Sequence, residues 1–112
     1  MLNECKLALR VTQTAYEPEL CSLMAAAAKD LEIAGVVLPG TVAFTASTGG
    51  MQDTSTLTDA LCMRAIFTYV RAHFGSPADY DRLAEAYELQ KCQLMHAETY
   101  TDYGEAEEDA ES

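Results

Sequence analysis

The stretch HFGSPADYDRL, His73–Leu83, decides the fold because one helical pattern ends within it and another begins. Gly75 can take the left-handed backbone conformation that closes a helix. Ser76 can cap the next helix, with Pro77 in its first position and Asp79 reaching back to the cap. A connection this short forces the two helices into a hairpin or a sharp corner. The sequence therefore predicts two long helices that meet at this corner.

Each helix beside the corner carries an apolar stripe. The helix before it is expected to begin near Leu57, with Thr56 as its cap and Asp59 in the reciprocal capping position. Both stripes repeat at the three- and four-residue steps of an amphipathic helix. They consist of Leu61, Cys62, Ile66, Phe67, Val70 and Phe74 before the corner, and of Tyr80, Leu83, Ala84, Tyr87, Lys91, Leu94 and Met95 after it.

Two further helices are expected in the first 35 residues. A short one over residues 2–11 places Leu2, Cys5 and Leu9 on one face. A longer one starts at Pro18, whose missing N–H has no partner in a first helical turn. It is expected to run for about 15 residues and to stop at Gly35. Its apolar face consists of Leu20, Leu23, Met24, Ala27, Ala28 and Leu31. The fold class is therefore all-α, a small bundle of about four helices.

Residues 36–56 have a different composition, with Asp53 as their only charged side chain. The first part, VVLPGTVAF, has β-branched residues on both sides of Pro39-Gly40, a turn-prone pair, and predicts a small β-hairpin. The second part, TASTGGMQDTST, has the composition of a loop. A connection of this length inside a small domain is generally functional or disordered. We therefore expect an insertion here that touches a partner, with Phe44 as a candidate contact residue.

The charge of the chain is concentrated at its C-terminal end. The net charge is −11 over 112 residues, and residues 98–112 hold seven acids and no base. Residues 1–98 are expected to form one helical domain. Residues 99–112 are expected to be a disordered, mobile acidic tail, because they cannot bury enough apolar surface to offset the entropy of ordering. No stripe of lysine and arginine is present to hold phosphates, which argues against ordinary nucleic-acid binding.

The compartment follows from the apolar runs and the cysteines. No run reaches the roughly 20 residues of a membrane helix, and the N-terminus lacks the pattern of a signal peptide. These features predict a chain that stays in the cytoplasm of the cell that makes it. The four cysteines form no C-x-x-C pair, and we expect them to be small buried hydrophobic residues rather than a disulfide framework.

The sequence offers little chemistry for an enzyme. It contains no G-x-G-x-x-G, P-loop, H-E-x-x-H or G-x-S-x-G motif. Cys92 and His96 stand four residues apart, which can place two metal ligands on one helix face, but a zinc site normally needs three or four. His73 is expected to interact with the C-terminal end of its helix. We therefore expect no catalytic residue, no cofactor and no metal.

Three stretches, taken in order, carry a resemblance to a known family. They are KLALRVTQTAYEPEL, DLEIAGV, and RAIFTYVRAHFGSPADYDRLAEAYELQKCQL. The corner supplies the most characteristic part, Tyr69-Val70-x-x-x-Phe74-Gly75 followed by Asp79-Tyr80-Asp81-Arg82-Leu83. Together they resemble the phage head–tail connector family over roughly residues 4–35 and 57–95. The 36–56 segment is longer and richer in threonine than the family pattern.

The resemblance implies a structural virion protein at the head–tail junction, present in the host cytoplasm during assembly. Such adaptors form a closed homo-oligomeric ring, commonly of about twelve subunits, below the portal protein. The ring extends the DNA channel, lets DNA pass without specific binding, and docks head-closure or tail proteins. The implied fold is a small all-α bundle, and the family is not enzymatic.

Contact residues can be suggested from the same reading. A head-to-tail ring uses two different patches on each subunit, and we expect the two long helices and the 36–56 segment to supply them. Arg64, Arg71 and Arg82 are candidates for pairing with acids of a neighbouring subunit. Tyr100 and Tyr103, set among acids, are candidates for binding the portal.

Two other functions fit the sequence. An acidic DNA mimic, or another small helical regulator, would bind a basic protein and release it in salt. A metal-binding regulator would use Cys92 and His96. Neither alternative accounts for the family resemblance.

Overall fold

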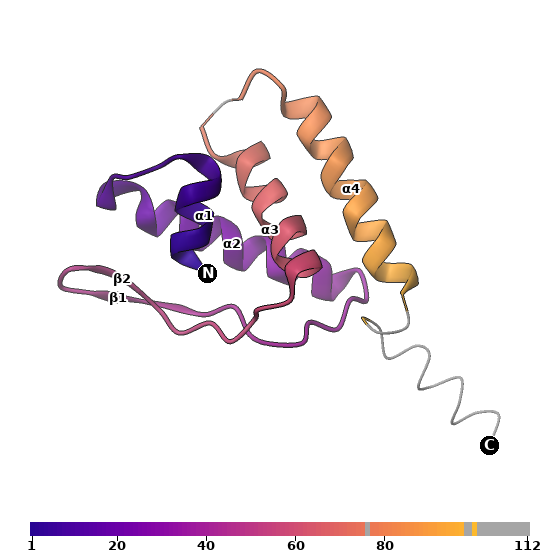
Figure 1. Cartoon of the computed structure of the whole chain (residues 1–112), viewed down its shortest axis with the longest axis horizontal. Helices are drawn as coiled ribbons and strands as arrows, with labels where there is room; N and C mark the ends of the chain where they lie inside the picture. Colours follow the sequence, from indigo (N-terminus) through magenta and orange to yellow (C-terminus); the bar gives the residue numbers. More distant parts are fainter. Residues whose placement is uncertain (76, 98–99, 101–112) are drawn as a thin grey trace.

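A computed structural model describes residues 1–75, 77–97 and Tyr100. The described residues form four α-helices, a short 3₁₀ turn and one two-stranded antiparallel sheet (Figure 1). The elements are α1 (Leu2–Leu9), η1 (Thr14–Tyr16), α2 (Glu17–Ile33), β1 (Phe44–Ser47), β2 (Gly50–Asp53), α3 (Ala60–His73) and α4 (Tyr80–His96). The protein is thus mostly helical, as predicted, and its small two-stranded sheet lies within the 36–56 insertion.

The helix α3 lies at the centre of the packing. It contacts α1, α2 and α4, and α4 runs back along it after the corner. The largest fully buried side chains come from α1, α2 and α3, and they are Cys5, Leu20, Met24, Leu31, Cys62, Ile66 and Val70. The predicted apolar faces of these three helices therefore form the core.

The stripe predicted on α4 is only partly buried. Tyr87 and Leu94 are buried against the core, whereas Tyr80 and Met95 are exposed. Since α4 packs mainly on α3, a single neighbouring helix covers only a narrow strip of it. Tyr80 and Met95 therefore belong to the predicted stripe, but the contact with α3 leaves them exposed.

The start of α3 differs from the sequence prediction. The helix begins at Ala60, and Asp59 is its N-cap, with its carboxylate accepting a hydrogen bond from the Cys62 N–H at 3.0 Å. Thr56 does not cap the helix: its hydroxyl oxygen accepts a hydrogen bond from the Thr41 N–H at 2.8 Å. Thr56 is used in a contact between distant segments, which local sequence does not reveal.

The corner is confirmed, although its last residues differ from the prediction. Gly75 has φ +71°, the left-handed conformation expected at the end of a helix. The next helix begins at Tyr80, so Pro77 precedes it rather than occupying its first position. Asp79 stands at the N-cap position without capping the backbone, and its carboxylate pairs with Arg82 instead. The predicted cap Ser76 lies outside the described residues.

The β-hairpin lies later in the chain than the sequence predicted. Its strands pair with Phe44 opposite Asp53 and Ser47 opposite Gly50, so Thr48 and Gly49 make the turn. The Pro39-Gly40 pair, expected to be the turn, lies before the first strand. Figure 1 shows the hairpin extending alongside the helices. The TASTGGMQDTST segment, expected to be a loop, therefore supplies most of the hairpin.

Polar contacts fix the hairpin to the helices. The Asp53 carboxylate accepts hydrogen bonds from the N-terminal amino group at 2.7 Å and from the Leu2 N–H at 2.9 Å. It thereby satisfies the first free N–H of α1, the role of a cap supplied from another element. On the same side, the Glu17 carboxylate accepts a hydrogen bond from the Met51 N–H and pairs with Lys6 at 2.6 Å.

Candidate interaction surfaces

The corner between α3 and α4 is lined by aromatic rings. The Tyr69 ring stacks on His73 with centroids 4.2 Å apart, and His73 meets the edge of Tyr80 at 5.7 Å. The Nδ1 of His73 lies 3.2 Å from the Tyr69 carbonyl oxygen in the last turn of α3. His73 thus interacts with the C-terminal end of its own helix, as its position in the sequence suggested.

Basic side chains also lie at this end of the molecule. Arg10 and Arg71 line one open hollow of about 260 Å³ between α1, α3 and the corner, together with the acidic Asp79. The Asp79 carboxylate pairs with Arg82. The hydrogen bond from Arg82 is the main cause of a lowered pKa for Asp79, and the positive charge of Arg71 also contributes. We call Arg10, Arg71 and Arg82 the arginine corner.

The outward face of α4 combines apolar and acidic side chains. Ala84, Leu89 and Cys92 line a shallow depression of about 450 Å³ together with Glu85 and Glu88. Leu89, the large apolar side chain of this depression, is 68% exposed. This depression, with its five lining residues, is the α4 face.

A larger groove runs between α2 and the segment before the hairpin. Its volume is about 630 Å³, and its walls combine small and apolar residues with two charged ones, Lys29 and Glu32. The remaining lining residues are Ala25, Ala28, Gly35, Val36, Val37, Leu38, Gly40, Thr41 and Val42. We call this groove, with its lining residues, the α2 groove. The α2 groove and the α4 face lie on different elements, and both include apolar side chains.

The far end of the α3–α4 pair holds Tyr100. Its hydroxyl donates a hydrogen bond to Asp59 at 2.9 Å, and its carbonyl oxygen accepts one from the Val37 N–H. Tyr100 and Arg64 line the same small hollow, beside Leu61. Tyr100 was assigned to the tail, yet its side chain packs against the core. The expected disorder of the following residues, 101–112, and the candidate Tyr103 lie outside the described part of the chain.

The other predicted contact residues are placed as follows. Arg64 and Arg71 are exposed on α3, and neither takes part in an ion pair within the described residues. Arg82 pairs with Asp79 in its own chain. Phe44 is half-buried and packs against the core, so it anchors the hairpin. As intersubunit contacts, all of these remain predictions.

The sequence reasoning missed Arg10 and Leu89. Arg10 follows α1 and has φ +58°, the only non-glycine residue with positive φ in the described ranges 1–75 and 77–97. Nothing in the local sequence distinguishes it from other surface arginines. Leu89 could have been found, because it falls outside the stripe of α4 and no other apolar face was assigned to it.

The cysteines divide into two groups. Cys5, Cys21 and Cys62 are buried, and burial raises the pKa of their thiols, to about 12 for Cys5 and Cys62 and to about 11 for Cys21. They are packing residues, as predicted. Cys92 is exposed, which corrects the expectation that all four are buried. The phase of α4 places Cys92 on its outward face.

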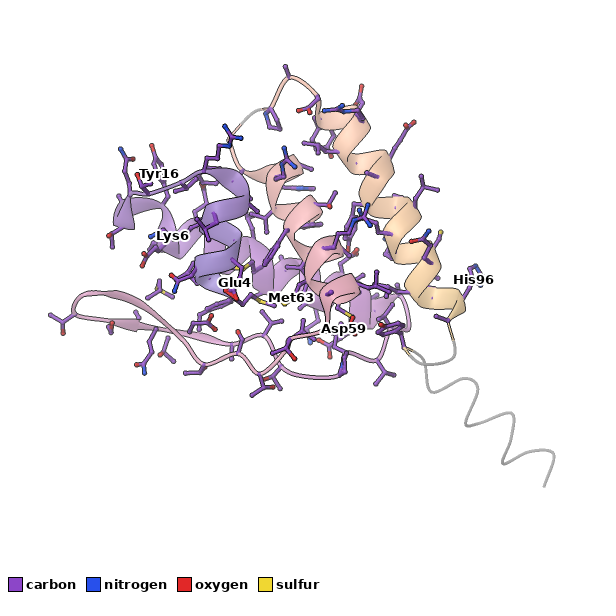
Figure 2. The ribbon with its side chains drawn as sticks, in the orientation of Figure 1. Glu4, Lys6, Tyr16, Asp59, Met63 and His96 are labelled. Carbon is purple, nitrogen blue, oxygen red and sulfur yellow. The ribbon has the colours of Figure 1, made fainter. Side chains whose placement is uncertain are left out.

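The Cys92–His96 pair of the metal-binding alternative is open to solvent. Cys92 and His96 are both exposed on α4, and Figure 2 shows His96 at the end of the helix, pointing away from the bundle. Among the residues that the structure describes, no group of three or more potential metal ligands lies together. Nor does any helix of this described part have the length and apolarity to cross a membrane.

The described residues thus form a small, mostly helical molecule with an arginine corner, an α4 face and an α2 groove. A family model described as phage connector protein matches residues 1–101, a range that includes every residue described by the structure. The chain therefore belongs to the phage connector protein family, a family of structural components of phage particles. Neither a curated protein nor a solved structure gives a significant match.

Proposed function

We propose that this chain is the subunit of a head–tail connector ring. Copies of it assemble head to tail below the portal of a DNA-filled head, extend the DNA channel and present a docking surface to head-closure or tail proteins. The observation that carries the proposal is the family match over residues 1–101. The ring, its position and its partners go beyond that match.

The surfaces of the subunit support a head-to-tail assembly. A closed ring of identical subunits needs two different complementary patches on each copy. The α4 face and the α2 groove lie on different elements, and each is lined by both apolar and charged residues. Leu89, exposed at 68%, is the apolar side chain that we assign to the centre of one such contact.

The charge of the chain supports a channel that DNA slides through. Repeated around a pore, subunits of net charge −11 surround the phosphates with a field of their own sign. Such a field keeps the DNA from adhering to the wall during packaging and ejection. Salt at physiological concentration limits it to distances of about 8 Å, so it acts only where acids line the pore.

The test is the mass of the chain measured by light scattering after size exclusion, alone and mixed with the portal protein from the same phage genome. We expect a closed ring with a central hole in electron micrographs, either of the chain alone or stacked on the portal. A chain that is monomeric under both conditions contradicts the proposal. If that monomer instead binds a basic protein and releases it in salt, it is a DNA mimic.

A further inference from the structure

The basic side chains of this acidic protein fall into two groups. Three of the seven have an acid partner in the described chain: Lys6 with Glu17, Lys91 with Asp30, and Arg82 with Asp79. Arg10 and Arg71 have none within the described residues, although they line the same hollow. Arg10 and Arg71 are thus two like charges in one hollow, and the acid that lines the same hollow, Asp79, is already paired with Arg82.

The backbone holds Arg10 in place at this hollow. Arg10 has φ +58° and ψ +40°, a left-handed conformation that is costly for a residue with a Cβ atom. Its N–H donates a hydrogen bond to the Leu7 carbonyl oxygen and closes α1. A glycine or asparagine would suit this position better. Arg10 therefore occupies a position that local backbone energetics do not favour, beside a second arginine.

A cluster of acidic side chains lies at the C-terminal end of the chain. Residues 101–112 contain six acids and no base. They follow Tyr100, which is held at the start of α3 by its hydrogen bond to Asp59. Arg71 lies in the last turn of α3, and a helix of 14 residues is about 21 Å long. The residue that precedes the acidic segment is therefore held at the start of α3, whereas Arg71 of the arginine corner lies at the end of α3.

We propose that the acidic segment 101–112 of one copy binds the arginine corner of a neighbouring copy. The proposal rests on the ring described above, because a head-to-tail contact joins two different parts of the subunit. Within one chain, Asp102 and Glu105 lie at most about 7 and 17 Å from Tyr100, short of the helix length. Only the last four acids could reach their own arginine corner, whereas a neighbouring copy can offer its arginine corner to the whole segment.

The alternative ligand for two arginines is DNA phosphate. The net charge of −11 opposes an approach of DNA, and two arginines beside Asp79 fall short of the basic stripe that phosphate binding requires. The observations therefore favour a protein ligand whose own acids are clustered.

The first test is direct binding. A fluorescent peptide with the sequence of residues 101–112 is titrated with the full chain, with the variant Arg10→Glu/Arg71→Glu, and with the control Lys29→Glu/Arg64→Glu, using fluorescence anisotropy. The control changes the net charge equally, at exposed bases outside the arginine corner. We expect the arginine-corner variant to weaken binding about tenfold or more and the control to leave it nearly unchanged. Peptide binding that is absent, or equally weakened by both variants, overturns the proposal.

The same titration is repeated with a short DNA duplex. DNA that binds more tightly than the peptide, and loses that binding in the arginine-corner variant alone, makes the site a phosphate site and also overturns the proposal. Salt is expected to weaken the peptide contact, since both partners are exposed and charged.

The second test separates binding between copies from binding within one. A variant with Glu107→Lys and Glu108→Lys reverses two charges of the acidic segment. The arginine-corner variant, Arg10→Glu/Arg71→Glu, reverses two charges of the site to which this segment is proposed to bind. We expect each alone to cross-link into larger species less than the wild type does, and an equal mixture of the two to recover cross-linking, because opposite charges then meet only between chains. No recovery in the mixture contradicts a contact between copies.

Failure of this inference is distinguishable from failure of the ring. Rings that form as well in the arginine-corner variant as in the wild type leave the connector function standing and remove the tail contact. If the peptide binds in a way that depends on the arginine corner but the chain never forms rings, the proposed contact stands and the proposed ring does not.

Discussion

At the scale of single residues, Asp53 joins more parts of the molecule than any neighbour in its segment. Its carboxylate binds the N-terminal amino group, the Leu2 N–H and the Ser55 N–H, and so connects the hairpin to α1. Partial burial by itself raises the pKa of Asp53, but these hydrogen bonds outweigh it and lower the pKa to about 2. The carboxylate is therefore more stable as an anion in the folded chain than in the unfolded one.

This gives a prediction for pH. The pKa of Asp53 falls from 3.8 in the unfolded chain to about 2 in the folded one. Its carboxylate therefore stabilises the folded chain fully above pH 4, and this stabilisation is lost as pH falls through 2. We expect Asp53→Asn to lower the free energy of unfolding at pH 6, and the difference from wild type to shrink below pH 4. Urea denaturation at several pH values measures it. Asp81→Asn, at an exposed acid on α4, is the control; a difference that does not depend on pH contradicts the account.

Tyr87 makes the second important single-residue contact. Its hydroxyl donates a hydrogen bond to the Asp30 carboxylate at 2.6 Å, and Lys91 donates to the same oxygen at 3.2 Å. The hydrogen bond from Tyr87 is the main cause of the lowered pKa of Asp30. This group links α4 to α2, which otherwise meet mainly through α3.

Removing one oxygen atom tests that link. Tyr87→Phe is expected to lower the free energy of unfolding by about 1 kcal/mol, since Lys91 still pairs with Asp30 and burial of the ring is retained. Tyr80→Phe is the matched control, because the Tyr80 side chain is 45% exposed. Thermal unfolding of both variants measures the difference. Equal losses in the two variants would show that the Tyr87 hydroxyl does not join the helices.

At the scale of elements, the helices could be predicted from the sequence, whereas the exact position of the hairpin could not. The repeats of α2 and α3 predicted helices because their buried residues, such as Met24 and Ile66, follow the helical period. The hairpin was placed too early because Pro39-Gly40 is the stronger local turn signal. Its true position depends on Asp53 and Glu17, whose partners are more than thirty residues away. The start of α3 was misplaced for the same reason, since Thr56 bonds to Thr41.

Two adjacent glycines test how the hairpin is held. Gly50 has φ +133°, and a Cβ atom there would lie 2.9 Å from the Glu17 carboxylate. Gly49 has no neighbour within 4 Å and no such backbone constraint. We expect Gly50→Ala to destabilise the protein by about 1–2 kcal/mol and to increase hydrogen exchange in the hairpin, while Gly49→Ala leaves both nearly unchanged. A reversed order would contradict the observed contact with Glu17.

At the scale of the whole molecule, the family resemblance was available from the sequence, and the surfaces were not. The corner motif and its neighbouring stripes suggested the connector family, which the match over residues 1–101 establishes. Arg10 and Arg71 come from different helices and meet only after folding. The exposed position of Cys92 depends on which side of α4 meets α3. Such features arise from packing between elements, so a local pattern does not predict them.

The α4 face gives a prediction about assembly. Leu89→Glu is expected to leave the stability nearly unchanged, because the side chain is already 68% exposed. It should raise the protein concentration at which rings form at least tenfold, since it places a charge at the centre of an apolar contact. Leu7→Glu, at a leucine of α1 that is 79% exposed, is the matched control. Light scattering as a function of concentration measures both, and unaffected rings in Leu89→Glu would exclude this face from the interface.

The most direct test of the connector function is electron cryo-microscopy of portal-bearing, DNA-filled heads incubated with the purified chain. The account predicts a second ring, coaxial with the portal, into which α1 to α4 fit with DNA passing through its centre. Heads that bind no added chain, or bind it away from the portal vertex, would contradict the account.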